Sequence, residues 1–234
     1  MTAALALSPD SRVTVESVGA ETMNVVVIDN CLAAPEAAVD LAASLPYLPI
    51  GPYYPGIRAA LGSTIVSGFA DALRETIEQH LGVAARDWAG ECFFSIATTP
   101  PAALMPIQRL PHFDGLEDTR IAALLYLARS DFGGTSFYRH RATGFETVDA
   151  ARYPRYGPAL KVDVERYGLP PPDYIGDGAP IFEEIATFEP VYNRMLVYRG
   201  NALHCSRMKN AGQLTPDPRR GRLTLNLFLQ PRAA

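Results

Sequence analysis

The chain has 234 residues, of which 48% are hydrophobic and 20% charged, and its net charge of -4 gives a pI of about 5.6. These values are typical of a folded globular protein rather than a disordered or membrane one, and they provide no overall positive field for nucleic acid or anionic lipid. The length fits one domain with a substantial core, so we expect a single domain over residues 1–234.

The three cysteines, Cys31, Cys92 and Cys205, are odd in number and widely spaced. They indicate neither a disulfide framework nor a zinc knuckle. No apolar run approaches the ~18 residues that cross a bilayer. We therefore expect a cytoplasmic protein that binds neither nucleic acid nor a membrane. Both a monomer and a homodimer are compatible with the sequence.

The first third of the chain predicts one strand and two helices. Residues 1–22 are expected to be a mobile or edge segment, and residues 24–29 read as a buried strand. Helices are expected over 35–45, with Pro35 in the first turn, and over 69–81, where Gly82 suits a left-handed C-cap. Between them, residues 48–62 are rich in Pro, Gly and Tyr and contain Arg58, which favours an irregular segment.

From residue 91 onward the pattern changes to strands, expected over 92–97, 121–127, 135–138, 194–198 and 222–229. Together with the two helices they predict an all-β core with flanking helices, as a helix-buttressed barrel or sandwich. Residues 150–180 are rich in Tyr, Pro and Arg and show little regular pattern. A segment of this kind is expected to be a lid-like insert, because long structureless loops are uncommon inside a compact domain.

His112 and Asp114 form the chemically most informative motif. Two residues apart on extended backbone, their side chains lie on the same face. A second histidine such as His204 would complete a 2-His-1-carboxylate face, which suits non-haem Fe(II) because three coordination positions remain open. A His-x-Asp pair by itself is a weak motif, so the surrounding sequence has to support it.

The last predicted strand supplies a candidate anion site. Arg222, Thr224, Asn226 and Phe228 fall on one face, and leucines occupy the alternate positions. If the leucines pack against the helices, Arg222 faces the interior, where an unpaired guanidinium is costly and favours a carboxylate ligand. A structural salt bridge is the alternative for Arg222.

These residues occur in an order that resembles the Fe(II)/2-oxoglutarate-dependent dioxygenases, and in particular their prolyl-hydroxylase-like branch. The resemblance covers roughly residues 90–230. It rests on His112-Phe113-Asp114, the apolar strand ending Tyr126-Leu127, Gly133-Gly134-Thr135-Ser136-Phe137, His204, and Arg222-Leu223-Thr224.

The resemblance implies a double-stranded β-helix, or jelly roll, with iron bound by His112, Asp114 and His204. It also implies 2-oxoglutarate bound through Arg222 and Thr224. Tyr126 and Asn226 are further candidate contacts of the cosubstrate, with core packing as the alternative for Tyr126. The branch usually places its carboxylate-binding residue about ten residues after the second histidine, whereas Arg222 follows His204 by 18. Three cationic residues in the enlarged loop therefore remain rivals of Arg222: Lys209, Arg219 and Arg220.

The favoured function is that of a dioxygenase that hydroxylates a small molecule, such as an amino acid or a derived metabolite, and releases succinate and CO2. Two alternatives are a hydroxylase of peptide or protein side chains and a catalytically silent jelly roll that binds a metabolite; a zinc hydrolase is less favoured. His140 is expected to be a loop residue. Candidate substrate contacts are Tyr138, Arg152, Tyr153, Arg155 and Tyr156.

Overall fold

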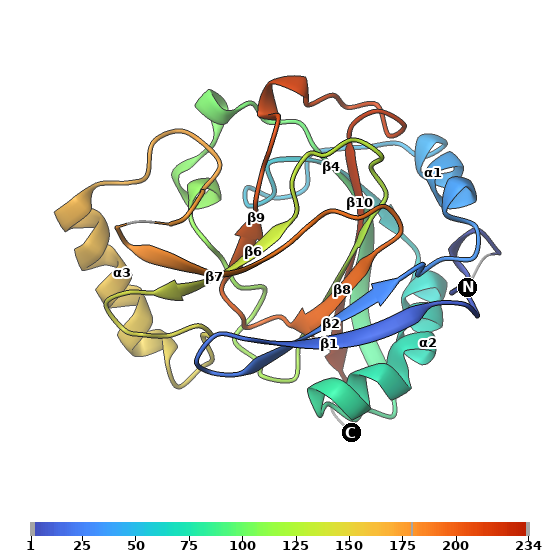
Figure 1. Cartoon of the computed structure of the whole chain (residues 1–234), viewed down its shortest axis with the longest axis horizontal. Coiled ribbons are helices and arrows are strands. Elements are labelled where there is room, and N and C mark those ends of the chain that lie inside the picture. Colours follow the sequence, from blue (N-terminus) through green and yellow to red (C-terminus); the bar gives the residue numbers. More distant parts are fainter. Residues whose placement is uncertain (1–2, 179, 233–234) are drawn as a thin grey trace.

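The computed structural model describes residues 3–178 and 180–232, which form two antiparallel sheets and three α-helices (Figure 1). The larger sheet has the strand order β1-β2-β8-β5-β10-β4-β3, and the smaller one the order β7-β6-β9. The strands are β1 (Arg12–Val18), β2 (Met23–Asp29), β3 (Gly56–Leu61), β4 (Trp88–Ala97), β5 (Ile121–Tyr126), β6 (Thr135–His140), β7 (Phe182–Phe188), β8 (Met195–Arg199), β9 (His204–Ser206) and β10 (Arg222–Pro231). The α-helices are α1 (Pro35–Ala43), α2 (Ser63–Leu81) and α3 (Tyr153–Tyr167).

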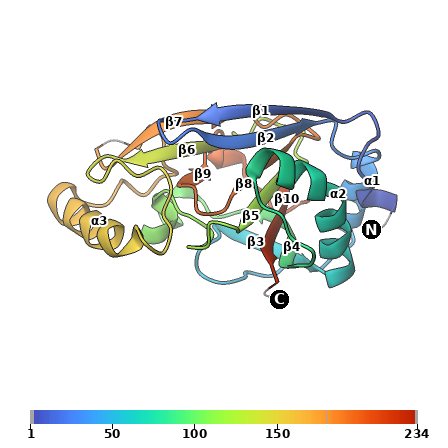
Figure 2. The ribbon, with the colours of Figure 1, turned by 90° about the horizontal axis from the view of Figure 1, so that it is seen from below.

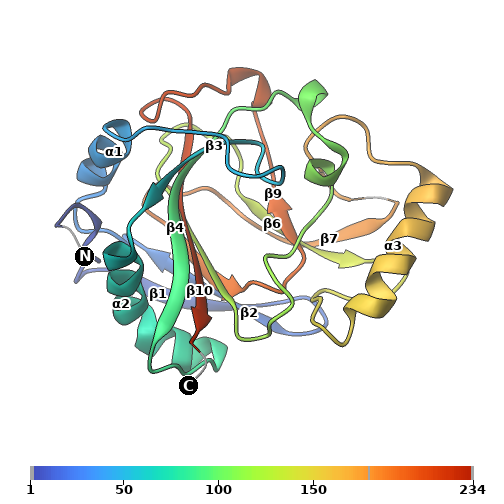
Figure 3. The same cartoon turned by 180° about the vertical axis from the view of Figure 1, so that it is seen from behind.

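The helices lie at two ends of the molecule. Helices α1 and α2 lie together at one end and α3 at the other, in every orientation shown (Figures 1 and 2). From behind, α2 lies alongside β4 and β10 (Figure 3), and it also contacts β2 and β8. The expectation of a β core with flanking helices is confirmed at this level. In the described part of the chain, no helix is both long and apolar enough to span a membrane.

The side chains of strand β10 alternate between the two faces of the large sheet, as the sequence predicts. Its leucines at 223, 225, 227 and 229 are fully buried against Phe69, Leu73 and Ile77 of α2. Full burial of a leucine contributes about 2 kcal/mol, so this face stabilises the core between the sheet and α2, which packs mainly on the neighbouring strand β4. Arg222, Thr224 and Asn226 consequently lie on the opposite, inner face.

The two expected helices form, and α2 is longer than predicted. It begins at Ser63 rather than Phe69, because Val66 extends the buried stripe by one turn. Gly82 ends it in the left-handed conformation, with φ of 66°, as expected. Helix α1 spans Pro35–Ala43, with Pro35 in its first turn.

Two segments expected to be irregular contain regular structure. The prediction for residues 48–62 is wrong in its second half, where β3 pairs with β4 from Gly56 to Leu61. The prediction for residues 150–180 is wrong over Tyr153–Tyr167, which form α3. Tyr156, Leu160 and Val164 recur every four residues and pack against one core cluster, a helical pattern that the prolines at 154 and 158 obscure. Residue 179 of this segment lies outside the described residues.

The N-terminal segment is an edge of the large sheet. Strand β1 pairs along its whole length with β2 and has no second neighbour in the sheet. Leu5 of the preceding 3-10 helix (Ala3–Leu5) is fully buried in the core under α1. Of the two alternatives for residues 1–22, the edge segment is what the structure contains, and residues 1 and 2 lie outside the described part.

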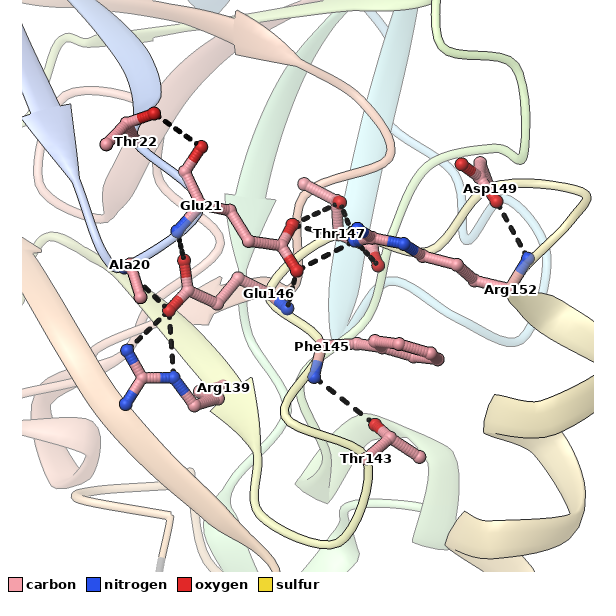
Figure 4. Close-up of polar contacts among 10 residues, drawn as sticks. All are labelled: Ala20, Glu21, Thr22, Arg139, Thr143, Phe145, Glu146, Thr147, Asp149 and Arg152. Carbon is pink, nitrogen blue, oxygen red and sulfur yellow. Dashed lines mark hydrogen bonds and ion pairs between the residues drawn. The ribbon is translucent and has the colours of Figure 1, made fainter.

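A buried carboxylate fixes the turn between β1 and β2 (Figure 4). Glu146 is fully buried and accepts hydrogen bonds from the backbone N–H groups of Ala20 (3.0 Å) and Glu21 (2.8 Å). The guanidinium of Arg139 balances its charge. The Glu21 side chain in turn accepts bonds from Arg152, which precedes α3. The network thus ties the edge hairpin to the segment that leads into α3.

Candidate metal centre and anion site

His112, Asp114 and His204 are brought together by backbone pairing between two distant segments. The N–H of each histidine donates to the carbonyl of the other, both at 2.9 Å, and the N–H of Asp114 donates to the carbonyl of Gly200 at 2.7 Å. Residues 112–114 are therefore extended beside β9. The extended backbone directs the side chains of His112 and Asp114 to the same side, where His204 also lies.

The donor atoms of the three side chains all lie within 4.8 Å of one another. Asp114 Oδ1 is 3.9 Å from His112 Nε2, and Oδ2 is 3.6 Å from His204 Nε2. The His204 and Asp114 side chains are 7% and 13% exposed, whereas that of His112 is 50% exposed. His204 and Asp114 are thus shielded from solvent, and the cluster is accessible to solvent at His112.

A hydrogen bond fixes the tautomer of His204. Its Nδ1 lies 2.9 Å from the carbonyl oxygen of Ala202. A carbonyl can only accept, so Nδ1 carries the proton and Nε2 keeps its lone pair toward Asp114. A metal-binding histidine requires this orientation, in which the second nitrogen is held by a backbone carbonyl.

The protonation states of His112 and Asp114 suit a bound cation. Desolvation, followed by the charges of His204 and Arg58, holds the pKa of His112 well below its usual value, and burial raises the pKa of Asp114. Oδ2 of Asp114 is buried without a hydrogen-bond partner among the described residues. A divalent ion would relieve both features, because it binds neutral imidazole and an ionised carboxylate. The three residues therefore fit a metal ion.

A row of four polar side chains crosses the inner face of the large sheet beside the cluster. Arg58 of β3 pairs with Ser95 of β4, Ser95 with Thr224 of β10, and Thr224 with Tyr126 of β5. Directly paired residues in antiparallel strands share a face, so the four form one line. The Tyr126 hydroxyl is 2.7 Å from Thr135 Oγ1, and Thr224 donates to Asn226 Oδ1 at 2.9 Å.

Arg222 lies on the same inner face, two residues before Thr224, and is 2% exposed. Its Nη2 donates to the carbonyl of Gly134 at 3.2 Å. Its Nε has no partner, and it forms no ion pair, among the residues that the structure describes. The structural salt bridge considered for Arg222 is therefore absent from the described residues. A buried guanidinium without a counter-charge fits an anionic ligand.

The three rival cations lie at the surface. Arg219 pairs with Asp40, and Lys209 with Asp131 and Glu189. Arg220 is exposed. Arg222 is thus the buried cation of this group.

Two of the five candidate substrate residues lie beside the motif. The rings of Tyr153 and Tyr156 contact Phe113, at centroid distances of 6.2 and 6.0 Å. Tyr153 is 48% exposed, whereas Tyr156 is buried. Because Phe113 points away from the face shared by His112 and Asp114, these two side chains pack α3 against the back of the metal-binding segment.

The other three candidates are engaged elsewhere. The hydroxyl of Tyr138 donates to the carbonyl of Gly176, and Arg152 pairs with Glu21. Arg155 lies over the ring of Phe145. The structure does not bring these three to the open side of the cluster.

The expectation for His140 is wrong. It is the last residue of β6 and fully buried, with Nδ1 2.9 Å from Thr143 Oγ1 and Nε2 3.1 Å from Asp163 of α3. Burial lowers its pKa, and Asp163 opposes this shift. His140 therefore links β6 to α3.

Sequence reasoning missed Tyr54, Arg58 and Ser95. All three have buried polar atoms without a hydrogen-bond partner in the described residues: Tyr54 Oη, Arg58 Nε and Ser95 Oγ. Ser95 was detectable, because it is the one polar residue within the apolar strand 92–97. Arg58 and Tyr54 lie in the Pro- and Tyr-rich segment, where no period of two was evident.

The comparison with protein families matches residues 9–229 to a family of unknown function, DUF6445. The chain belongs to this family. No curated protein matches it significantly.

Among solved structures, the chain is similar to HygX from Streptomyces hygroscopicus. With nickel and 2-oxoglutarate bound, HygX gives a TM-score of 0.55 at 14% identity over 90% of this chain and 84% of HygX. The HygX structure with nickel, 2-oxoglutarate and hygromycin B bound gives 0.53 at 14% identity over the same shares, and the one with iron bound gives 0.52 at 15% identity over 90% and 83%. At this identity the likeness establishes a shared fold.

Proposed function

We propose that the chain is a single-domain Fe(II)- and 2-oxoglutarate-dependent oxygenase that hydroxylates a small molecule. The observation that carries the proposal is the convergence of His112, Asp114 and His204 within 4.8 Å, with the unpaired guanidinium of Arg222 on the same inner face of the sheet. In this interpretation the two sheets correspond to a double-stranded β-helix. HygX, which shares the fold, is known with iron and with nickel and 2-oxoglutarate bound.

His112 and His204 would each offer a ring nitrogen to the metal, and Asp114 a carboxylate oxygen. Three ligands on one side leave three positions open. The half-exposed side of His112 gives these positions access from outside, while the buried side of His204 is closed by the rings of Phe137 and Tyr198. The protein would thus shield two ligands and leave the third at the entrance.

Arg222 would bind the distal carboxylate of 2-oxoglutarate. Its Nε faces no other partner, and a guanidinium fork matches a carboxylate in two parallel hydrogen bonds. Thr224, next on the same face, would add a hydroxyl donor once its proton turns from Asn226 Oδ1 to the ligand. Tyr126 is held by Thr135 and has its pKa raised to about 12, mainly by burial, so it remains a neutral hydrogen-bond donor or acceptor.

With iron and 2-oxoglutarate bound, such a centre uses O2 to oxidise a substrate C–H bond and releases succinate and CO2. The protein itself would position the substrate carbon and exclude water. Phe113 lies between two ligands in the sequence and points to the opposite face, where Tyr153 and Tyr156 cover it, so these rings would hold the metal-binding segment against α3.

The proposal is tested by succinate release from 2-oxoglutarate in the presence of Fe(II), ascorbate and a panel of amino acids and related metabolites. Wild-type protein should form succinate, and Asp114→Ala should reduce the rate at least 100-fold. Asp118→Ala changes an exposed aspartate near the motif and should leave the rate unchanged. Absence of succinate from the wild type across the panel, together with absence of metal binding, would refute the proposal.

A further inference from the structure

A second guanidinium, that of Arg58, faces the inner side of the sheet at the edge strand β3. It is one of the four residues in the polar row, at the opposite end from Tyr126. The guanidinium carbon lies 4.3 Å from the ring centroid of Tyr54, 5.2 Å from that of Phe93 and 6.0 Å from that of Phe228. Aromatic rings hold its plane in place from several sides, and a guanidinium held in this way is preorganised to bind a ligand.

Arg58 has no counter-charge of its own. Within the described part of the chain its guanidinium forms neither a hydrogen bond nor an ion pair, and its Nε is buried. Burial lowers the pKa of Arg58, and Tyr54, Asp114 and Glu91 only partly oppose this shift. Asp114 would be engaged by the metal in the proposed function. Arg58 would then face the centre as an uncompensated cation.

Two buried hydroxyl groups lie beside Arg58. One is Oγ of Ser95, the residue of β4 that pairs with Arg58 of β3. The other is Oη of Tyr54, whose ring lies against the Arg58 guanidinium. Both atoms are buried, and neither makes a hydrogen bond of good geometry to a described residue, although the Tyr54 hydroxyl is directed toward Ser95 and Thr224. A rigid fork with hydroxyl donors beside it is an arrangement that recognises a carboxylate.

Counted over the metal, its cosubstrate, Asp114, Arg222 and Arg58, the formal charges leave room for one further anionic group; Glu91, the other carboxylate that acts on Arg58, is exposed. Arg58 and Arg222 contribute one positive charge each, a divalent metal two, and Asp114 one negative charge, which leaves three positive charges. The 2-oxoglutarate dianion reduces this to one. A single substrate carboxylate would balance it, provided that any ammonium group of the same molecule lies away from these charges, whereas a dianionic phosphate would exceed it.

We infer that Arg58, with Ser95 and Tyr54, binds a carboxylate of the substrate and so restricts the substrate class to monocarboxylates such as amino acids or their acyl derivatives. The inference rests on the proposed function, because it assigns Arg222 to 2-oxoglutarate and leaves Arg58 for the substrate. Phe93 and Phe228 would contact the apolar part next to that carboxylate.

The site can be tested without knowing the substrate, by using bromide as a probe. Crystals of the protein loaded with Mn(II) and 2-oxoglutarate are soaked in sodium bromide, and anomalous scattering locates the ion. Bromide should lie on the Arg58 guanidinium, with the distal carboxylate of 2-oxoglutarate on Arg222, and the bromide should be absent from Arg58→Met. A 2-oxoglutarate carboxylate on Arg58, or no anion there, would overturn the inference.

A solution measurement extends the test to organic ligands. The melting temperature of the Mn(II)- and 2-oxoglutarate-loaded protein is measured with amino acids and with their primary amides. Acids that raise it should bind about 10- to 100-fold more tightly than their amides, and Arg58→Met should abolish this difference. Arg86→Met removes an exposed arginine and should behave as wild type. Equal binding of acid and amide would overturn the inference, and if no compound binds, the bromide position decides.

Failure of the inference and failure of the proposed function give different results. If the chain binds neither Mn(II) nor 2-oxoglutarate, the proposed function fails regardless of Arg58. If both bind and bromide avoids Arg58, the proposed function stands and the carboxylate site is wrong.

Discussion

Replacing Arg222 with methionine should change stability and cosubstrate binding in opposite directions. In the protein without ligand, Arg222 is 2% exposed and Nε is unpaired, so its removal relieves a desolvation cost of about 1–3 kcal/mol. Loss of the bond to Gly134 costs about 1 kcal/mol. The free energy of unfolding should therefore stay the same or rise by up to ~2 kcal/mol, which is a few degrees in melting temperature.

The same change should weaken 2-oxoglutarate binding. Two charge-assisted hydrogen bonds at about 1.5–3 kcal/mol each correspond to a loss of about 100-fold or more in affinity. Calorimetric titration of 2-oxoglutarate into Mn(II)-loaded wild type and Arg222→Met measures it. Arg222→Lys keeps the charge without the fork and should lose less. A variant that is clearly destabilised but binds 2-oxoglutarate normally would show that Arg222 is structural.

Two further predictions concern buried charges away from the centre. Glu146→Gln should lower the free energy of unfolding by about 3 kcal/mol, because it leaves Arg139 without its buried partner, and should speed hydrogen exchange at Ala20 and Glu21. The control Glu183→Gln changes a half-exposed partner of the same arginine and should lower it by less than about 1 kcal/mol. Equal losses in the two variants would contradict the network. Because the folded-state pKa of His140 lies below 6.5, the unfolded state binds more protons there, so stability should fall as pH drops from 6.5 toward that lowered pKa. His140→Gln should flatten this part of a denaturation profile, and parallel profiles would contradict the assignment.

The fold elements that could be predicted are those whose burial depends on a short local period. Strand β10 alternates leucine with polar residues, and α2 repeats apolar residues every four positions, so both were identified. Strand β3 has only six residues at the edge of the sheet, and its alternation is masked by Gly56 and the flanking prolines. Its pairing is decided by β4, a long-range partner that local sequence does not reveal.

The residues of the site also differ in whether the local sequence identifies them. His112, Asp114 and His204 could be selected because their order resembles that of a known family, and Arg222 because it is in phase with a clear strand. Arg58 and Tyr54 could not, since they become part of the site only when β3 adds to the sheet edge. The helix α3 was missed because Pro154 and Pro158 interrupt a helical pattern. Pro154 is tolerated because it lies in the first turn.

Metal binding tests the central claim most directly. Equilibrium dialysis of the protein under anaerobic conditions, with Fe(II) or Mn(II) and with or without 2-oxoglutarate, should give one ion per chain in wild type and Asp118→Ala. Asp114→Ala should bind at least 100-fold more weakly, and 2-oxoglutarate should bind tightly only to metal-loaded protein. Equal metal binding by wild type and Asp114→Ala, or 2-oxoglutarate binding that ignores the metal, would contradict the account.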